Sequence, residues 1–105
     1  NFEEKSDTIR RRVIAARKVQ LKRQGKTNVQ LSSSELQQYC KLDTESVDFI
    51  KMVSKKLNIS ARSYTRIQKL SRTIADLDNS KKILLGHVKE SIQYRSLEKM
   101  SSFFN

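Results

Sequence analysis

Proline is absent from this chain of 105 residues, and its only glycines are Gly25 and Gly86. Sheets and barrels need turn residues far more often than that, because tight turns join their strands. The shortage therefore predicts an all-α fold. The length predicts one domain over residues 1–105, built as a small bundle of about five helices.

The chain also has few of the residues on which catalytic and metal sites are built. One cysteine, Cys40, excludes an internal disulfide, and we expect it to be a half-buried small hydrophobe in a reducing cytoplasm. One cysteine and one histidine, His87, cannot form a zinc site, so we expect no metal. His87 fits a structural hydrogen bond at a helix start better than the role of a general base.

Sequence segments typical of enzymes and membrane proteins are missing as well. The two glycines lie too far apart for a phosphate-binding loop of the G-x-x-x-x-G-K-[ST] type. The eleven acidic residues form no catalytic pair, and no apolar run approaches the roughly 20 residues of a membrane span. We therefore expect no catalytic residue, no cofactor held by the chain alone and no membrane partner.

Positive charge is what the chain has in excess. The 22 lysines and arginines outnumber the 11 acids and give a formal net charge of +11. Such an excess favours an acidic partner: nucleic acid, a nucleotide or an acidic protein face. The alternative is a lysine-rich surface that only keeps the protein in solution.

The first helix is predicted from about Ser6 to Gln24, with Gly25 as its left-handed stop. Its apolar side is expected to comprise Ile9, Val13, Ala16 and Leu21. Seven cations occupy the same helix and are expected to make its surface basic in several directions: Arg10, Arg11, Arg12, Arg17, Lys18, Lys22 and Arg23. The alternative is a solvated helix face.

Capping signals predict the starts of the later helices. After a loop through Lys26-Thr27-Asn28, Ser32 and Glu35 have capping-box spacing, with Leu31 and Leu36 as a hydrophobic staple, for a short helix ending near Tyr39-Cys40. A third helix is expected from Asp43 or Thr44, with its buried face formed by Val47, Ile50, Val53 and Leu57. A fifth is expected to start between Ser80 and His87 and to carry Val88, Ile92, Leu97, Met100 and Phe104.

The fourth helix has an unusual start. Ser60 is its predicted N-cap, and the apolar stripe expected along it is Tyr64, Ile67, Leu70, Ile74 and Leu77. Arg62 puts a cation in the first turn, where the helix dipole favours acids. An anion bound at this helix end, with phosphate the obvious choice, would account for it. The alternative is a solvated arginine at an indifferent position.

Many residues match a known pattern. From Leu57 to Arg95 they are Ser60-Ala61-Arg62, Tyr64, Arg66-Ile67, Arg72-Thr73-Ile74-Ala75-Asp76-Leu77, Ser80, Ile83, His87 and Gln93-Tyr94-Arg95, and upstream Arg10, Arg12-Val13, Ala15-Ala16-Arg17, Gln20, Cys40 and Leu42. This series resembles the C-terminal lid domain of the magnesium-chelatase-like (ComM-type) AAA+ ATPases. Ser63, Thr65 and Ser91 depart from the glycine, histidine and alanine common in that family.

The resemblance implies a role for the misplaced cation. Arg62 would be a sensor-2 arginine that reaches from the lid to the β- and γ-phosphates of ATP, bound with Mg²⁺ in a nucleotide-binding core outside this chain. Arg66 either assists it or, like Lys69, only solubilises the helix. The partners implied are the chain's own core and neighbouring subunits of a ring, a hexamer by analogy. The chain would then be a piece of a longer protein and not an enzyme by itself.

Two analogies suggest different activities for the longer protein. By analogy with the competence-type branch it would move DNA strands, and by analogy with the chelatase branch it would drive metal insertion. The pattern Ser60-Ala61-Arg62-x-Tyr64 is closer to the first. A different class of function is a free-standing basic module that binds nucleic acid, with Arg10, Arg11, Arg17 and Lys18 as candidate phosphate contacts. That alternative gives no special place to Arg62. A helical adaptor for a partner protein would explain the charge but not the position of Arg62.

Overall fold

The computed structural model describes the backbone of residues 2–104 and the side chains of residues 7–94. The described part has no strand. It contains α1 (Phe2–Gln24), the 3₁₀ turn η1 (Asn28–Gln30), α2 (Ser33–Tyr39), α3 (Thr44–Leu57), α4 (Ala61–Leu77) and α5 (Leu85–Phe104). The predicted all-α fold of about five helices is confirmed. None of the described helices is long and apolar enough to cross a membrane.

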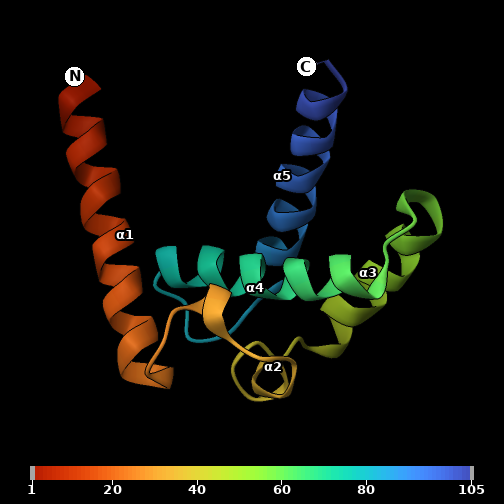
Figure 1. The fold of residues 1–105 in the computed structure, drawn as a ribbon, viewed down its shortest axis with the longest axis horizontal. Helices are drawn as coiled ribbons and strands as arrows, with labels where there is room; N and C mark the ends of the chain where they lie inside the picture. The colour runs from red at the N-terminus through yellow and green to blue at the C-terminus, as the bar shows by residue number, and fades with distance from the viewer. Residues whose placement is uncertain (1, 105) are drawn as a thin grey trace.

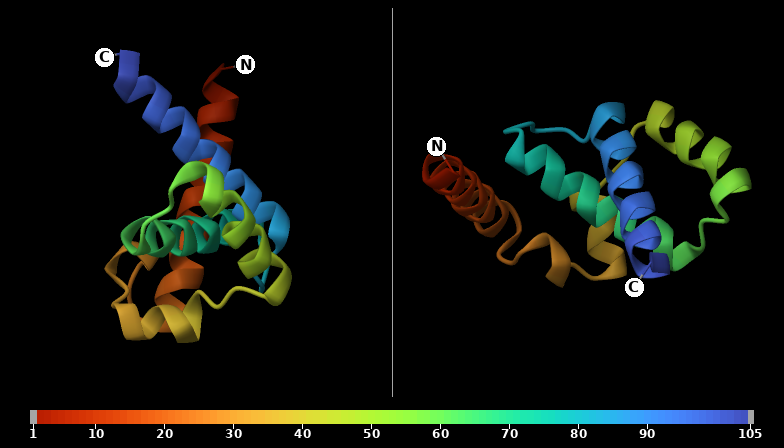
Figure 2. Two further views of the ribbon diagram at one scale, coloured as in Figure 1. Left: turned by 90° about the vertical axis from the view of Figure 1, so that its right-hand side faces the viewer. Right: turned by 90° about the horizontal axis from the view of Figure 1, so that it is seen from above.

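Helix α4 is the centre of the fold. It contacts α1, α2, η1 and α5, while α3 packs against α5. Helices α1 and α5 rise from the same side of α4, so both ends of the chain point the same way (Figure 1). Seen from above, α4 runs between α1 and α3, and α5 crosses over it (Figure 2). The apolar core lies where α2, α3, α4 and α5 meet, and it includes Leu36, Ile50, Ile67 and Val88.

The predicted helix starts are confirmed by their hydrogen bonds. The Ser63 N–H donates to Ser60 Oγ at 3.2 Å at the start of α4, and the Ser46 N–H donates to Asp43 Oδ1 at 2.8 Å at the start of α3. In α2 the Ser32 N–H donates to the Glu35 carboxylate at 2.9 Å. This bond, with help from Lys26, lowers the pKa of Glu35 to about 2. Such bonds satisfy N–H groups that have no partner within the helix.

Helix α1 differs from its prediction in two ways. It starts at Phe2 rather than near Ser6, although it ends at Gln24 before Gly25, whose φ is +75° as expected. Its predicted apolar side is wrong at both ends, because Ile9 is 59% and Leu21 52% exposed. Helix α1 packs mainly against α4, and a single neighbouring helix buries only a narrow strip of its surface. The residues in that strip are Val13, Ala16, Gln20 and Arg23.

Three further predictions are corrected by the structure, two of them by burial. Leu57 was expected in the core but is 42% exposed, because it lies in the last turn of α3. Cys40 is fully rather than half buried. The loop expected at residues 26–28 instead leads into the 3₁₀ turn η1. Helix α5 starts within its predicted range, with Val88 and Ile92 buried, whereas the side chains of Leu97, Met100 and Phe104 lie outside the described residues.

Candidate functional site

Two arginines share one buried carboxylate at the junction of α1 and α4. Asp76 accepts from Arg23 Nη1 at 2.8 Å and Nη2 at 3.1 Å, and from Arg72 Nε at 3.1 Å. The side chains of Arg72 and Asp76 are 4% and 1% exposed, and that of Arg23 is 24% exposed. Burial alone would raise the pKa of Asp76, but hydrogen bonds from Arg23 and Asn28 and the charge of Arg72 keep it below its ordinary value.

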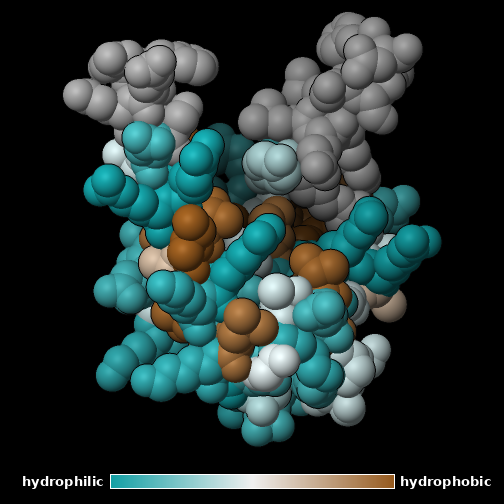
Figure 3. All heavy atoms as spheres, turned by 60° about the vertical axis from the view of Figure 1, so that its left-hand side comes forward, coloured by the Kyte–Doolittle hydropathy of each residue, from teal (hydrophilic) through white to brown (hydrophobic). Residues whose placement is uncertain are grey.

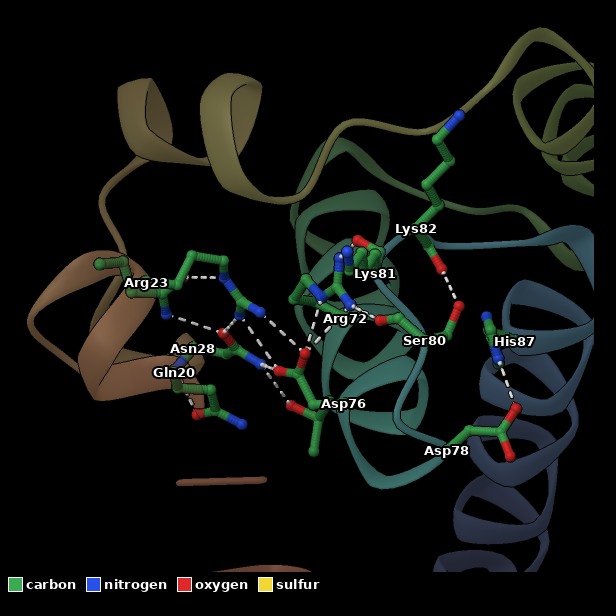
Figure 4. A network of polar contacts seen from close by, with 12 residues as sticks. Gln20, Arg23, Asn28, Arg72, Asp76, Asp78, Ser80, Lys81, Lys82 and His87 are labelled. Atoms are coloured by element: carbon green, nitrogen blue, oxygen red, sulfur yellow. Dashed lines mark hydrogen bonds and ion pairs between the residues drawn. The ribbon is translucent and has the colours of Figure 1, made fainter. Parts of the chain in front are cut away.

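The 3₁₀ turn η1 is tied into the same group of side chains. Asn28 Nδ2 donates to Asp76 Oδ2 at 3.0 Å and to Thr73 Oγ1 at 3.1 Å, and its own Oδ1 accepts from Arg23. Its backbone N–H donates to the buried Gln20 at 3.0 Å. Figure 4 shows these residues arriving from α1, η1 and α4 at one point. We call Gln20, Arg23, Asn28, Arg72 and Asp76 the polar junction.

Arg72 also holds the loop between α4 and α5. Its Nη2 donates to Ser80 O at 2.7 Å and its Nη1 to Lys81 O at 3.1 Å (Figure 4). Burial lowers the pKa of Arg72 from its ordinary value, and the Asp76 carboxylate opposes that shift. The arginine thus fixes where α5 begins.

His87 completes the start of α5. The Leu84 N–H donates to His87 Nδ1 at 2.9 Å, so Nδ1 is unprotonated and Nε2–H donates to Asp78 Oδ2 at 3.1 Å. His87 is 6% exposed. The expected structural hydrogen bond at a helix start is confirmed, and both ring nitrogens have a partner.

Arg62 lies in different surroundings. It is exposed in the first turn of α4, which contains no acid, and no described residue forms a hydrogen bond or ion pair with its side chain. The last turn of α3, just before it along the chain, adds Lys55 and Lys56. Arg66 is also exposed. Neither arginine is used to hold the described part of the fold together, so both are free to meet a ligand or another domain.

Lys69, expected only to solubilise α4, has a structural contact instead. Its Nζ donates to Val29 O at 3.1 Å and so ties η1 to α4. The predicted basic row of α4 therefore separates into a structural lysine near its middle and two exposed arginines, Arg62 and Arg66, toward its start.

The cations of α1 separate in the same way. Arg23 belongs to the polar junction, and Arg12 Nη2 donates to Leu77 O at 3.2 Å. The four candidate nucleic-acid contacts are all exposed, and no described side chain pairs with them: Arg10, Arg11, Arg17 and Lys18. They alternate with the exposed apolar residues Ile14 and Leu21. Figure 3 shows this mixture of polar and apolar residues on the side of the molecule where α1 lies.

The described side chains form no group of three or more histidines, cysteines or acids that could hold a metal ion. What the sequence did not indicate is the polar junction. The one available signal was the spacing of Arg72 and Asp76, which are four residues apart on a helix and so face each other. Nothing in the sequence pattern linked Asp76 to Arg23 and Asn28, which lie 53 and 48 residues earlier.

The chain matches the family model described as "Magnesium chelatase, subunit ChlI C-terminal" over residues 3–95, which is most of its length. The chain belongs to this family. The match includes every residue of the polar junction as well as Arg62 and Arg66. The sequence resemblance to the C-terminal domain of magnesium-chelatase-like proteins is therefore confirmed.

Curated relatives agree with the family assignment. Over 97 residues the chain is 40% identical to the "Uncharacterized protein YifB" of Escherichia coli and 38% identical to the "Competence protein ComM" of Haemophilus influenzae. A YifB of Salmonella typhimurium is 35% identical over the same length. Each match covers 92% of this chain but 19% of the relative, so the chain spans about a fifth of the length of these proteins.

Proposed function

We propose that this member of the magnesium-chelatase C-terminal family is the helical lid of an AAA+ ATPase, and that Arg62 is its sensor-2 arginine. The core with ATP and Mg²⁺ belongs to the longer protein. In this proposal Arg62 reaches the β- and γ-phosphates, and ATP ties lid to core until hydrolysis releases the tie.

The observation that carries the proposal is the freedom of Arg62. Arg23 and Arg72 both donate hydrogen bonds to Asp76. Arg62, in contrast, is exposed at the positive end of α4 and has no partner among the described residues. An arginine fits the role because its planar guanidinium can hold two phosphate oxygens and stays charged at any working pH. The Ala61 and Arg62 N–H groups, which precede the capped Ser63 N–H, add donors beside it.

Ring assembly and substrate are part of the same proposal. The lid would contact its own core and a neighbouring subunit, with a hexamer as the expected ring. The competence relative favours DNA as the substrate of the longer protein over metal insertion. Because α1 carries exposed Arg10, Arg11, Arg17 and Lys18, it is the part of the lid that would meet a nucleic acid.

The test uses the full-length protein, with Arg62→Ala, Arg62→Lys and the matched variant Lys51→Gln on the exposed side of α3. We expect Arg62→Ala to lower ATP turnover by about 10²-fold, in line with losses seen when one preorganised charge contact to a reacting group is removed. Arg62→Lys should recover part of the activity, since charge without the planar fork remains. Lys51→Gln should match the wild type. Turnover within twofold of wild type in Arg62→Ala would exclude the sensor-2 role.

The second candidate function, a basic nucleic-acid-binding module, is favoured by the four exposed cations of α1. It predicts that duplex or single-stranded DNA binds the chain and that affinity falls steeply between about 50 and 200 mM salt. Changing Arg10 and Arg17 together to glutamine should then weaken binding, while Arg62→Ala should not. Binding that depends on Arg62 alone would contradict the module and support a lid.

A further inference from the structure

A basic pocket lies beside Arg72 of the polar junction. It has a volume of about 420 Å³ and opens between the α2–α3 connection and the loop from α4 to α5. Its charged lining consists of Lys41, Arg72, Lys81 and Lys82 against one acid, Asp43. The Asp43 carboxylate caps its own helix by accepting from the Ser46 N–H. The pocket is therefore surrounded by an excess of positive charge.

The polar junction next to this pocket carries more positive than negative charge, on the buried Arg72 and the partly exposed Arg23. Arg23 and Arg72 carry two positive charges, and Asp76 supplies one negative charge to both. A partly buried excess charge is stabilised when a counter-charge comes close. Arg72 lines the pocket, and while one Nη1 N–H donates to Lys81 O, the other has no acceptor among the described residues. An anion in the pocket would restore the balance.

The loop from α4 to α5 forms one wall of the pocket. The carbonyls of Ser80 and Lys81 accept from Arg72, and the carbonyl of Lys82 accepts from Ser80 Oγ at 2.6 Å. The N–H of a trans peptide points away from its carbonyl, so the next N–H groups point away from these donors. No described residue accepts from the N–H groups of Lys81, Lys82 and Ile83. Because the Lys81 and Lys82 N–H groups point away from Arg72, an anion held by the Arg72 guanidinium is bound by side chains rather than by these backbone groups.

We propose that this pocket binds a phosphate group, with Arg72 at its base and Lys41, Lys81 and Lys82 at its rim. Phosphate fits because it offers several acceptor oxygens and more than one negative charge to guanidinium and ammonium donors. Ten residues of α4 separate Arg72 from Arg62, which is about 15 Å along the helix. The pocket is thus distinct from the nucleotide contact proposed for Arg62 and does not depend on it.

The test titrates the ¹⁵N-labelled chain with pyrophosphate and follows backbone and arginine side-chain NMR signals. We expect the largest shifts at Lys41, Arg72 and the N–H groups of Lys81 to Ile83. Lys81→Gln combined with Lys82→Gln should weaken binding about three- to tenfold, the effect of removing two exposed charge contacts. Lys51→Gln combined with Lys55→Gln removes the same charge from α3 and should leave affinity within twofold.

Two results would overturn the proposal. Equal weakening by both double variants would mean that pyrophosphate responds only to net charge. If Arg62→Ala lost pyrophosphate binding while the Lys81 and Lys82 double variant kept it, the anion would bind at the start of α4 instead of in the pocket. Thermal melts of each variant by circular dichroism establish that the compared proteins are folded.

The source of the phosphate is resolved by a second titration with a short single-stranded oligonucleotide. Shifts at the same N–H groups, reduced by the Lys81 and Lys82 double variant, would assign the pocket to the phosphate backbone of a nucleic acid strand. Pyrophosphate shifts there with oligonucleotide shifts confined to α1 would assign it to a small phosphate compound. Both results support a phosphate pocket, whereas shifts confined to α1 with both ligands contradict it.

Discussion

Arginines that look alike in the sequence do different work in this domain. Arg23 and Arg72 are held by hydrogen bonds to Asp76, whereas Arg62 and Arg66 are exposed. The sequence predicted Arg62 as the residue to watch because its local chemistry, a cation at a helix start, is readable within one turn. It did not predict the polar junction, because that depends on α1 and η1 coming to rest against α4. Local signals cannot report such distant contacts.

Asp76 gives the sharpest prediction at the level of single residues. Asp76→Asn keeps the shape of the side chain but removes the negative charge shared by Arg23 and Arg72. We expect the free energy of unfolding to fall by about 3–5 kcal/mol, because breaking a buried ion pair leaves a charge uncompensated. Urea unfolding followed by circular dichroism at neutral pH measures the change.

Asp48→Asn is the matched control for that measurement. Asp48 is an exposed acid of α3, and its substitution should change stability by no more than about 0.5 kcal/mol. A loss of under 1 kcal/mol in Asp76→Asn would show that the junction adds little to stability and that its charges are well hydrated.

At the level of helices, ends were easier to predict than buried faces. Ser60, Asp43 and the Ser32–Glu35 pair each start a helix at the expected place, since a cap acts through atoms only a few residues away. Leu21 and Leu57 were wrongly assigned to the core. Whether an apolar residue is covered depends on which neighbour lies over it, and an amphipathic pattern does not identify that neighbour.

The two glycines provide a test at this level, because one backbone requires glycine and the other does not. Gly25 ends α1 with φ at +75°, where a Cβ is strained, so Gly25→Ala should destabilise the domain by about 1 kcal/mol. Gly86 lies in the first turn of α5, and a Cβ there would meet nothing within 4 Å. Gly86→Ala should therefore stabilise by up to about 1 kcal/mol.

Thermal unfolding of Gly25→Ala, Gly86→Ala and the wild type measures the two changes in stability. The two variants are directly comparable because each adds one methyl group. Destabilisation by Gly86→Ala would indicate that α5 does not begin where the hydrogen bonds of His87 place it.

For the whole molecule, composition predicted the class of fold but not its arrangement. The lack of proline and near-lack of glycine correctly indicated a helical bundle. They did not indicate that α4 would lie at the centre, with polar residues such as Gln68, Arg72 and Asp76 buried on it. A helix packed on more than one side buries residues outside its apolar stripe, and those must then find hydrogen bonds inside the fold. The resemblance to magnesium-chelatase-like proteins added the family, which spacing and charge alone could not supply.

Because Cys40 is buried, the rate at which a thiol reagent modifies it reports on the stability of the whole domain. Its side chain is fully covered where α2 ends, its carbonyl accepts from Gln68, and burial raises the pKa of its thiol to about 11. A thiol reagent should therefore modify the native chain very slowly and the chain in denaturing guanidinium at once, since modification requires the core to open. Asp76→Asn should speed the native reaction by roughly two to four orders of magnitude, as its loss of stability implies. A wild-type rate close to that of the unfolded chain would mean that α2 detaches from α4 without global unfolding.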